Sequence, residues 1–187
     1  MGSQRLPERL RWALQLLDVG PDDEVLEIGC GPGVAVSLVC ERLDGGRITA
    51  IDRSAAIRRA TERNASHLAT GRAILRQVDL AGLPPTGQRF DKIFAVNVSL
   101  FWTAPADAEV RRLRQLLRPG GVVHLVYEMP AGTDAEWIAE AAAAALSRHG
   151  FAATVTTAGS PSLRCITATT TWRCYPRAAR STRNARV

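Results

Sequence analysis

The chain has 187 residues, of which 46% are apolar and 22% charged, and its formal net charge is +6. This length suits one domain with a normal core and leaves no room for a second large domain. The apolar content argues against a disordered chain, and no apolar stretch approaches the roughly 20 residues that a membrane helix needs, so we expect a soluble protein.

The first half of the chain alternates short apolar runs with helical patterns. A short run bounded by turn residues predicts a strand, and apolar residues recurring every three or four positions predict a helix. In chain order the sequence predicts a helix over Leu6–Leu17, a strand over Glu24–Ile28, a helix over Val34–Leu43, a strand over Arg47–Ile51, a helix over Ser54–Ala69 and a strand over Ala73–Val78. Ser54 is the expected N-cap of the last of these helices.

The second half continues the alternation after a loop marked by Pro84 and Pro85. It predicts strands over Phe90–Asn97 and Gly121–Tyr127, helices over Asp107–Leu117 and Ala135–Arg148, and two final strands over Phe151–Thr157 and Arg164–Thr171.

Alternating strands and helices of these lengths predict an α/β fold. Runs that are apolar on both faces are typical of buried parallel strands, and right-handed crossovers place helices on both faces of a doubly wound sheet. The last two strands are joined by AGSPSL, which is too short for a crossover helix, so they must be antiparallel. We therefore expect a seven-stranded, mostly parallel, Rossmann-like sheet with a C-terminal antiparallel strand.

Ligands of such sheets bind beyond the carboxyl ends of the strands. After the first strand, Gly29, Gly31 and Gly33 permit tight bends and close approach of a ligand, and the helix starting near Val34 offers unpaired N–H groups.

Acidic residues end the next two strands. Asp52 stands 19 residues beyond Gly33, where a carboxylate can accept both hydroxyl hydrogens of a ribose. Asp79 follows the third strand and is placed to accept a hydrogen bond from an adenine amino group. Each residue alone is also compatible with a turn or a helix cap, and the combination at successive strand ends carries the prediction.

Five segments in the right order resemble the class I S-adenosylmethionine-dependent methyltransferases, over roughly Leu16–Thr170. These segments are EIGCGPG, AIDRS, VDLAGLP, FDKIFAVN and LRPGGVVHLV. The resemblance implies that the first segment holds the amino acid part of S-adenosylmethionine, the second its ribose and the third its adenine, with Asn97 near the sulfonium. The cofactor-binding residues implied are Glu27, Gly29, Cys30, Gly31, Gly33, Asp52, Arg53, Asp79, Leu80 and Asn97.

A nicotinamide dinucleotide is the alternative cofactor, because its GxGxxG fingerprint is similar. Here the last position is Val34 rather than Gly or Ala, and Gln88 stands four residues before Lys92, where short-chain reductases have Tyr. The sequence therefore favours S-adenosylmethionine.

Methyl transfer needs little beyond holding donor and acceptor in line, so the catalytic residue is unknown from the sequence. Glu128, at the end of the fifth strand, is a weak candidate for a general base, and His124 is more often a neutral core residue in such a position. Phe101 and Trp102 follow the fourth strand, where the resemblance implies an acceptor pocket. Packing of this loop onto the core explains the two aromatic residues equally well.

We expect a small-molecule O- or N-methyltransferase. Val98 and Ser99 replace the prolines of the motif found in methyltransferases of base amines, which disfavours nucleic acid as the acceptor. Two alternatives remain: an RNA or protein methyltransferase that uses a basic tail, and an inactive cofactor-binding partner subunit.

The basic surplus lies at the C-terminus. The segment 173–187 carries five arginines and no acidic residue, so we expect a methyltransferase domain over 1–172 and a disordered tail after it. The cysteines lack paired ligand spacing, so no metal site is expected. The N-terminus lacks the apolar segment of a secretory signal, which predicts a cytoplasmic protein. A monomer and a homodimer are both compatible with the sequence.

Overall fold

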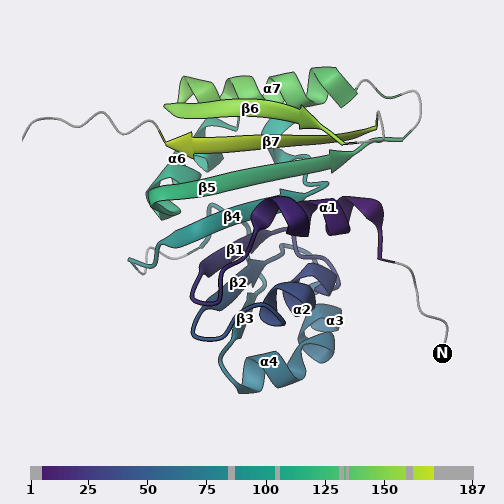
Figure 1. Ribbon diagram of the computed structural model, residues 1–187, viewed down its shortest axis with the longest axis vertical. Coiled ribbons are helices and arrows are strands. Elements are labelled where there is room, and N and C mark those ends of the chain that lie inside the picture. Colours follow the sequence, from purple (N-terminus) through teal and green to yellow (C-terminus); the bar gives the residue numbers. More distant parts are fainter. Residues whose placement is uncertain are drawn as a thin grey trace, which may run out of the picture.

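The computed structural model describes residues 6–83, 87–103, 106–130, 133, 135–158 and 162–170. Within this part of the chain, seven strands form one sheet (Figure 1). They are β1 (Glu24–Ile28), β2 (Arg47–Ile51), β3 (Ala73–Arg76), β4 (Phe90–Val96), β5 (Leu117–Glu128), β6 (Phe151–Thr157) and β7 (Leu163–Thr170). The helices are α1 (Glu8–Leu17), α2 (Val34–Cys40), α3 (Ile57–Arg63), α4 (Ala65–Ala69), α5 (Leu100–Thr103), α6 (Asp107–Leu116) and α7 (Ala135–Arg148).

The strand order is β3-β2-β1-β4-β5-β7-β6. Neighbouring strands from β3 to β5 are parallel, whereas β7 is antiparallel to both β5 and β6. The predicted α/β sheet with a C-terminal antiparallel strand is therefore confirmed. The order reverses between β1 and β4, and the crevice at such a switch point is where doubly wound sheets bind ligands.

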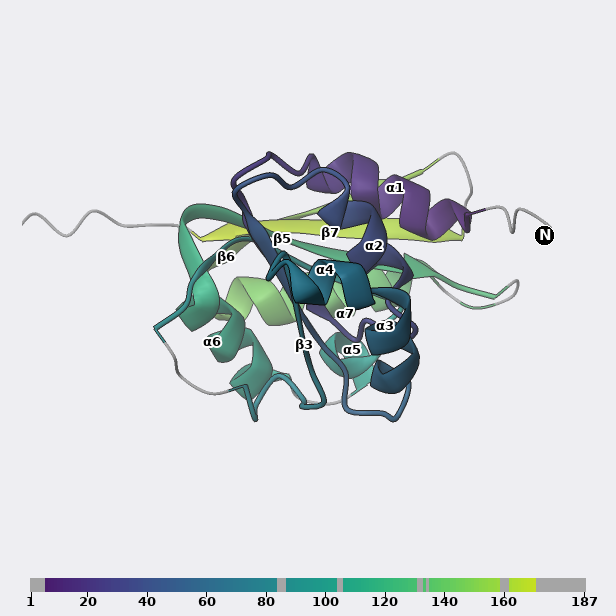
Figure 2. The ribbon, with the colours of Figure 1, turned by 90° about the horizontal axis from the view of Figure 1, so that it is seen from below.

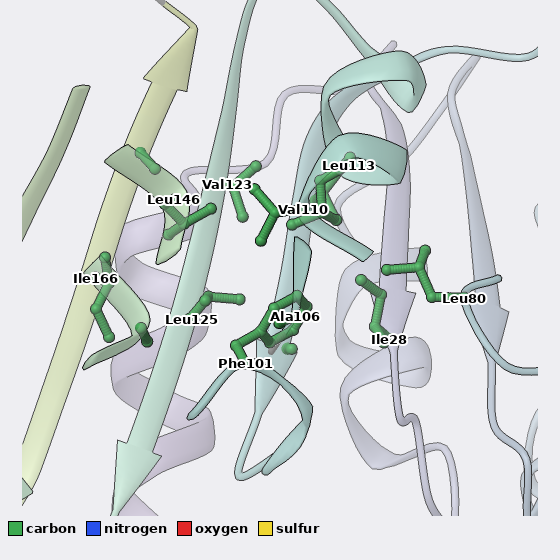
Figure 3. Close-up of a cluster of buried hydrophobic side chains, with 14 of the residues drawn as sticks. Ile28, Leu80, Phe101, Ala106, Val110, Leu113, Val123, Leu125, Leu146 and Ile166 are labelled. Carbon is green, nitrogen blue, oxygen red and sulfur yellow. The ribbon is translucent and has the colours of Figure 1, made fainter. Parts of the chain in front are cut away.

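Helices cover both faces of the sheet. Figure 2 shows α1 and α2 on one side of the strands and α6 and α7 on the other. Side chains alternate between the faces along a strand, so Leu26 and Ile28 pack in the core on the α6 and α7 side, while Val25 packs against α2. Figure 3 shows the first of these cores, in which Ile28 and Leu80 lie beside each other.

The predicted helix over 54–69 is wrong as a single element. It is divided into α3 and α4 at Asn64, whose φ of −107° leaves the helical region. The side chain of Asn64 bonds to main-chain carbonyls, which competes with continuation of the helix. Ser54 is not the N-cap either, because α3 begins three residues later and Ala56 holds that position.

Smaller differences concern the ends of the other elements. Strand β5 begins at Leu117, earlier than the predicted Gly121, and the short helix α5 was not predicted. In the described part of the chain, none of the helices is both long and apolar enough to span a bilayer. The predicted tail, 173–187, lies outside the described residues.

Candidate functional site

The glycine turn after β1 is left-handed at each predicted glycine, with φ of 73° at Gly29, 52° at Gly31 and 73° at Gly33. A Cβ on Gly29 would lie 2.6 Å from Cγ2 of Val98, and one on Gly33 would lie 2.8 Å from Cβ of Ala60. A Cβ on Gly31 would meet no described heavy atom within 4 Å. Packing therefore requires two of the glycines, and the third leaves open space for a ligand.

Asn64 supports this turn through hydrogen bonds and was not predicted from the sequence. Its buried side chain donates hydrogen bonds to the carbonyl oxygens of Gly33 at 3.0 Å and Ala60 at 2.9 Å. Its Oδ1 accepts a hydrogen bond of 2.7 Å from Ser37 Oγ. One side chain thus joins the turn to α2 and α3. The only signal in the sequence was a poor helix former inside a helical pattern.

Asp52 lies beside the turn and is held by several donors. Its Oδ2 accepts a hydrogen bond of 2.7 Å from Gly31 N–H, and its Oδ1 accepts bonds from the N–H and Oγ of Ser54 at 2.8 and 2.7 Å. Partial burial acts to raise the pKa of Asp52, but these hydrogen bonds and the charge of Arg53 hold it below the ordinary value. The side chain is thus an oriented carboxylate.

Glu27 is buried on the α2 face of β1, with 3% of its surface exposed. Burial, together with the nearby charge of Asp52, raises its pKa to about 8. Its Oε2 has no hydrogen-bond partner among the described residues. A buried carboxyl oxygen without a partner is costly, and a cationic group held at the glycine turn would satisfy it.

A cleft of about 550 Å³ opens beyond the carboxyl ends of β1, β2 and β4. This volume is within the usual range of small-molecule sites, roughly 300–1,000 Å³. Six of the predicted site residues line it: Gly29, Asp52, Arg53, Asp79, Leu80 and Asn97. Lining residues that the sequence analysis did not name as site residues include Val98, Ser99, Leu100, Thr103 and Glu109.

The segment after β3 forms one wall of the cleft. Asp79 is exposed there, and its Oδ1 accepts a hydrogen bond of 2.7 Å from Gly82 N–H. The side chain of Leu80 is buried in the core, with 1% exposed, so only the main chain of this residue is available to a ligand.

Asn97 joins the ends of β4 and β5. Its φ is 54°, its N–H donates to Val126 O at 2.8 Å, and its Oδ1 accepts a bond of 2.7 Å from Glu128 N–H. The left-handed backbone turns the chain into the segment 98–100 that lines the cleft.

The two predicted acceptor residues do not line this cleft. Phe101 is 1% exposed and packs in the core beside Ala106 (Figure 3). Trp102 packs against the same core and makes an edge-to-face contact with Trp137, with ring centroids 6.2 Å apart. The sequence left two alternatives for these residues, an acceptor pocket and packing of the loop onto the core. In this structure both side chains pack onto the core. Their neighbours Leu100 and Thr103, on the other side of the short helix, line the cleft instead.

The candidates for acid–base chemistry also lie away from the cleft lining. Glu128 accepts a hydrogen bond of 2.6 Å from Arg9 in α1, which forms an ion pair. His124 is buried, and its Nδ1 lies 3.2 Å from Thr167 Oγ1. Burial lowers the pKa of His124 to about 4, so it is a neutral core histidine at pH 7. Burial also raises the pKa of the Cys30 thiol to about 12, which leaves it unreactive.

Comparison with known proteins matches residues 25–121 to the family described as a methyltransferase domain. The chain is 38% identical over 128 residues to a trans-aconitate 2-methyltransferase of Paracidovorax citrulli, covering 66% of this chain and 46% of that protein. It is 33% identical over 129 residues to the nocamycin O-methyltransferase of Saccharothrix syringae, covering 68% of this chain and 45% of that protein. The chain spans about half the length of the curated relatives it matches.

Among solved structures, the N-methyltransferase NodS of Bradyrhizobium japonicum, in complex with S-adenosyl-L-homocysteine, has a similar fold. The TM-score is 0.66 at 21% sequence identity, covering 86% of this chain and 84% of that one.

Proposed function

The chain belongs to the class I S-adenosylmethionine-dependent methyltransferases, and on this premise we propose that it transfers a methyl group from S-adenosylmethionine to an oxygen or nitrogen atom of a small molecule. The observation that carries the proposal is the arrangement of Asp52. This carboxylate is bonded to the glycine turn and shares one cleft with Asp79.

The residues present fit the cofactor in three ways. Among the described residues, Oε2 of Glu27 has no partner and is available to the amino group of the amino acid part, and the open space at Gly31 admits a chain close to the backbone. A carboxylate accepts about four hydrogen bonds, and Asp52 accepts two on Oδ1 and one on Oδ2, so Oδ2 keeps a lone pair for a ribose hydroxyl. Asp79 and the main chain of Leu80 are available to the adenine.

Bound S-adenosylmethionine supplies a methyl group that is already activated for transfer. The chain has to bind the cofactor, orient it and leave room for an acceptor in line with the methyl group. We assign the acceptor side to the wall formed by Ser99, Leu100 and Thr103, because these residues follow β4 and line the same cleft. A general base is not required for an acceptor that loses its proton to water.

A small-molecule acceptor is supported by the relatives that are named for trans-aconitate and nocamycin. The cytoplasmic location and the monomeric or dimeric state remain predictions from the sequence. The alternative that uses the basic tail depends on residues outside the described part of the chain.

Calorimetric titration with S-adenosylmethionine tests the proposal. Asp52→Ala should weaken binding by at least about tenfold, because the hydrogen bond from a ribose hydroxyl to the charged carboxylate is lost. The matched control is Glu62→Ala, an exposed carboxylate of α3 that should leave binding unchanged. No binding by the wild-type protein, or equal binding by both variants, would overturn the assignment. Transfer of a labelled methyl group to a metabolite extract then separates an enzyme from an inactive cofactor-binding subunit.

A further inference from the structure

The charges that line the cleft are unbalanced. Its charged lining residues are three carboxylates and one guanidinium, namely Asp52, Asp79, Glu109 and Arg53. The hydrogen bonds to Asp52 and Asp79 come from neutral donors of Gly31, Ser54 and Gly82. None of the three carboxylates forms a salt bridge with a described residue.

Glu109 is the carboxylate in this set that the proposed cofactor contacts leave unused. It lies half-buried in the first turn of α6, and no described residue donates a hydrogen bond to it. Two residues earlier, Asp107 is bonded to His149 at 2.7 Å and lies 3.9 Å from Arg148. Asp107 thus already places a paired acid at the N-terminus of this helix, where negative charge is favourable. Glu109, which lines the cleft and has no partner among the described residues, is therefore available for a ligand.

A second observation indicates the same ligand charge. Oε2 of Glu27, near the carboxyl end of β1, is buried and has no hydrogen-bond partner among the described residues, and the cleft opens beyond the same end of this strand. A positively charged ligand would stabilise the ionised carboxyl groups of both Glu27 and Glu109, and a bound anion would destabilise them.

We propose that Glu109 makes the cleft selective for positively charged ligands, favouring the sulfonium cofactor over its neutral product and an amine acceptor over a polycarboxylate. The inference rests on the proposed function and names the acceptor class of the same site. S-adenosylmethionine carries a net charge of about +1 and S-adenosylhomocysteine about zero at neutral pH, because only the sulfonium differs. Trans-aconitate, the acceptor named for one relative, carries three carboxyl groups, and Arg53 is the only cationic side chain that the described lining offers it.

The reaction moves positive charge onto the acceptor. An amine that binds in its cationic form would first lose a proton to water, because an ammonium nitrogen has no lone pair. The lone pair of the neutral nitrogen would then form the bond to the methyl carbon, while the bond between that carbon and sulfur breaks and sulfur keeps the electron pair. The nitrogen is then cationic and loses a proton to water. A carboxylate in the cleft stabilises the cationic nitrogen of the methylated amine but does not attract the neutral thioether of S-adenosylhomocysteine. Replacement of S-adenosylhomocysteine by S-adenosylmethionine is therefore favoured.

Binding measurements on the cofactor pair test the first half of the proposal. The wild type should bind S-adenosylmethionine more tightly than S-adenosylhomocysteine, and Glu109→Gln should reduce this preference by about three- to tenfold at low salt. Glu109→Asp keeps the charge and should retain the preference. Glu140→Gln, an exposed position of α7, is the matched control and should change nothing.

Equal preferences in the wild type and Glu109→Gln would overturn the proposal. A purely structural role of Glu109 would instead lower the thermal midpoint of Glu109→Gln and weaken both ligands alike. Failure of the wild type to bind either ligand would refute the proposed function itself. This outcome differs from equal preferences, which would refute only the role of Glu109.

Methyl transfer tests the acceptor half. Labelled cofactor is incubated with a mixture of primary and secondary amines and, separately, with trans-aconitate. Transfer to the amines that falls at least about tenfold in Glu109→Gln supports the proposal. Transfer to trans-aconitate, or no transfer to the amine mixture, removes the assigned acceptor class.

Discussion

Gly31 and Asp52, which are 21 positions apart in the chain, are joined by a hydrogen bond of 2.7 Å from the Gly31 N–H to Oδ2 of Asp52. The end of β2 adds two more bonds, because the Ile51 carbonyl accepts the N–H groups of Gly29 at 2.8 Å and Cys30 at 3.1 Å. The glycine turn and the acidic residue therefore form one rigid unit before a cofactor binds. Such preorganisation lowers the entropic cost of binding.

The hydroxyl of Ser54 contributes to this orientation. Ser54→Ala removes the Oγ donor to Oδ1 of Asp52 but leaves the two main-chain donors. We expect the dissociation constant for S-adenosylmethionine to rise about two- to fivefold, the usual size for loss of one hydrogen bond near a charged group. Calorimetry measures this change, with Ser66→Ala in α4 as the control. An unchanged constant would show that the main-chain donors alone orient the carboxylate.

The glycines should separate into a binding role and a packing role. Gly31→Ala should cost about 1 kcal/mol of stability for its positive φ and weaken cofactor binding at least about tenfold, because its methyl group enters the open space. Gly33→Ala should cost more than about 2 kcal/mol, since its Cβ would overlap Ala60 and Asn64. Denaturant unfolding and calorimetry measure both effects.

Gly71 provides the matched control for this pair. Its φ is 72°, and a Cβ there meets no described atom within 4 Å. Gly71→Ala should therefore show the stability cost of Gly31→Ala without the loss of binding. If Gly31→Ala binds the cofactor normally, the ligand does not approach the backbone at this glycine.

Glu27 should make stability fall as pH rises. Its pKa is about 8 in the folded protein and near 4.5 in the unfolded chain, so the folded state holds a proton that the unfolded state loses between these values. Glu27→Gln mimics the protonated form. It should raise the free energy of unfolding at pH 8 by up to a few kcal/mol, roughly as linkage predicts, and have little effect near pH 4.

The same variant should bind S-adenosylmethionine more weakly, because a neutral amide replaces the partner of the amino group. Denaturation at several pH values and titration at pH 8 measure the two effects together. A variant that is no more stable than the wild type at pH 8 would show that Glu27 is ionised in the free protein.

His124 should make the protein sensitive to acid. Its pKa is lowered to about 4 by burial, whereas an unfolded histidine has a value of 6.5. The stability present above pH 6.5 is therefore lost as pH falls toward 4, because the unfolded state takes up the proton first. His124→Gln should move the midpoint of acid unfolding, measured by circular dichroism, to lower pH. His67→Gln in α4 is the control, and equal shifts in both variants would contradict the assignment.

Much of the fold could be predicted from local pattern. The alternation of apolar runs predicted the parallel sheet, and the short connection before β7 predicted its reversed direction, because a crossover helix needs more residues than AGSPSL contains. Helix ends were less predictable. Asn64 divides one predicted helix in two, since its side chain bonds to the glycine turn 31 positions away.

Side-chain direction was the weaker part of the site prediction. Phe101 and Trp102 were placed in the right segment, yet they face the core while Leu100 and Thr103 face the cleft. A four-residue helix has no periodicity from which its buried face can be read. Glu128 was likewise placed at the right strand end, but its ion pair with Arg9 spans 119 positions.

The sequence by itself determined the sheet, the glycine turn and the acidic residues at the ends of β2 and β3. These features follow from short runs that are apolar on both faces and alternate with helical patterns, and from the rule that ligands bind beyond the carboxyl ends of parallel strands. Only the tertiary structure decided that Oε2 of Glu27 is buried without a partner among the described residues, that Asn64 supports the turn and that Glu109 lines the cleft. Each depends on packing between segments that are distant in the chain, which no local pattern encodes.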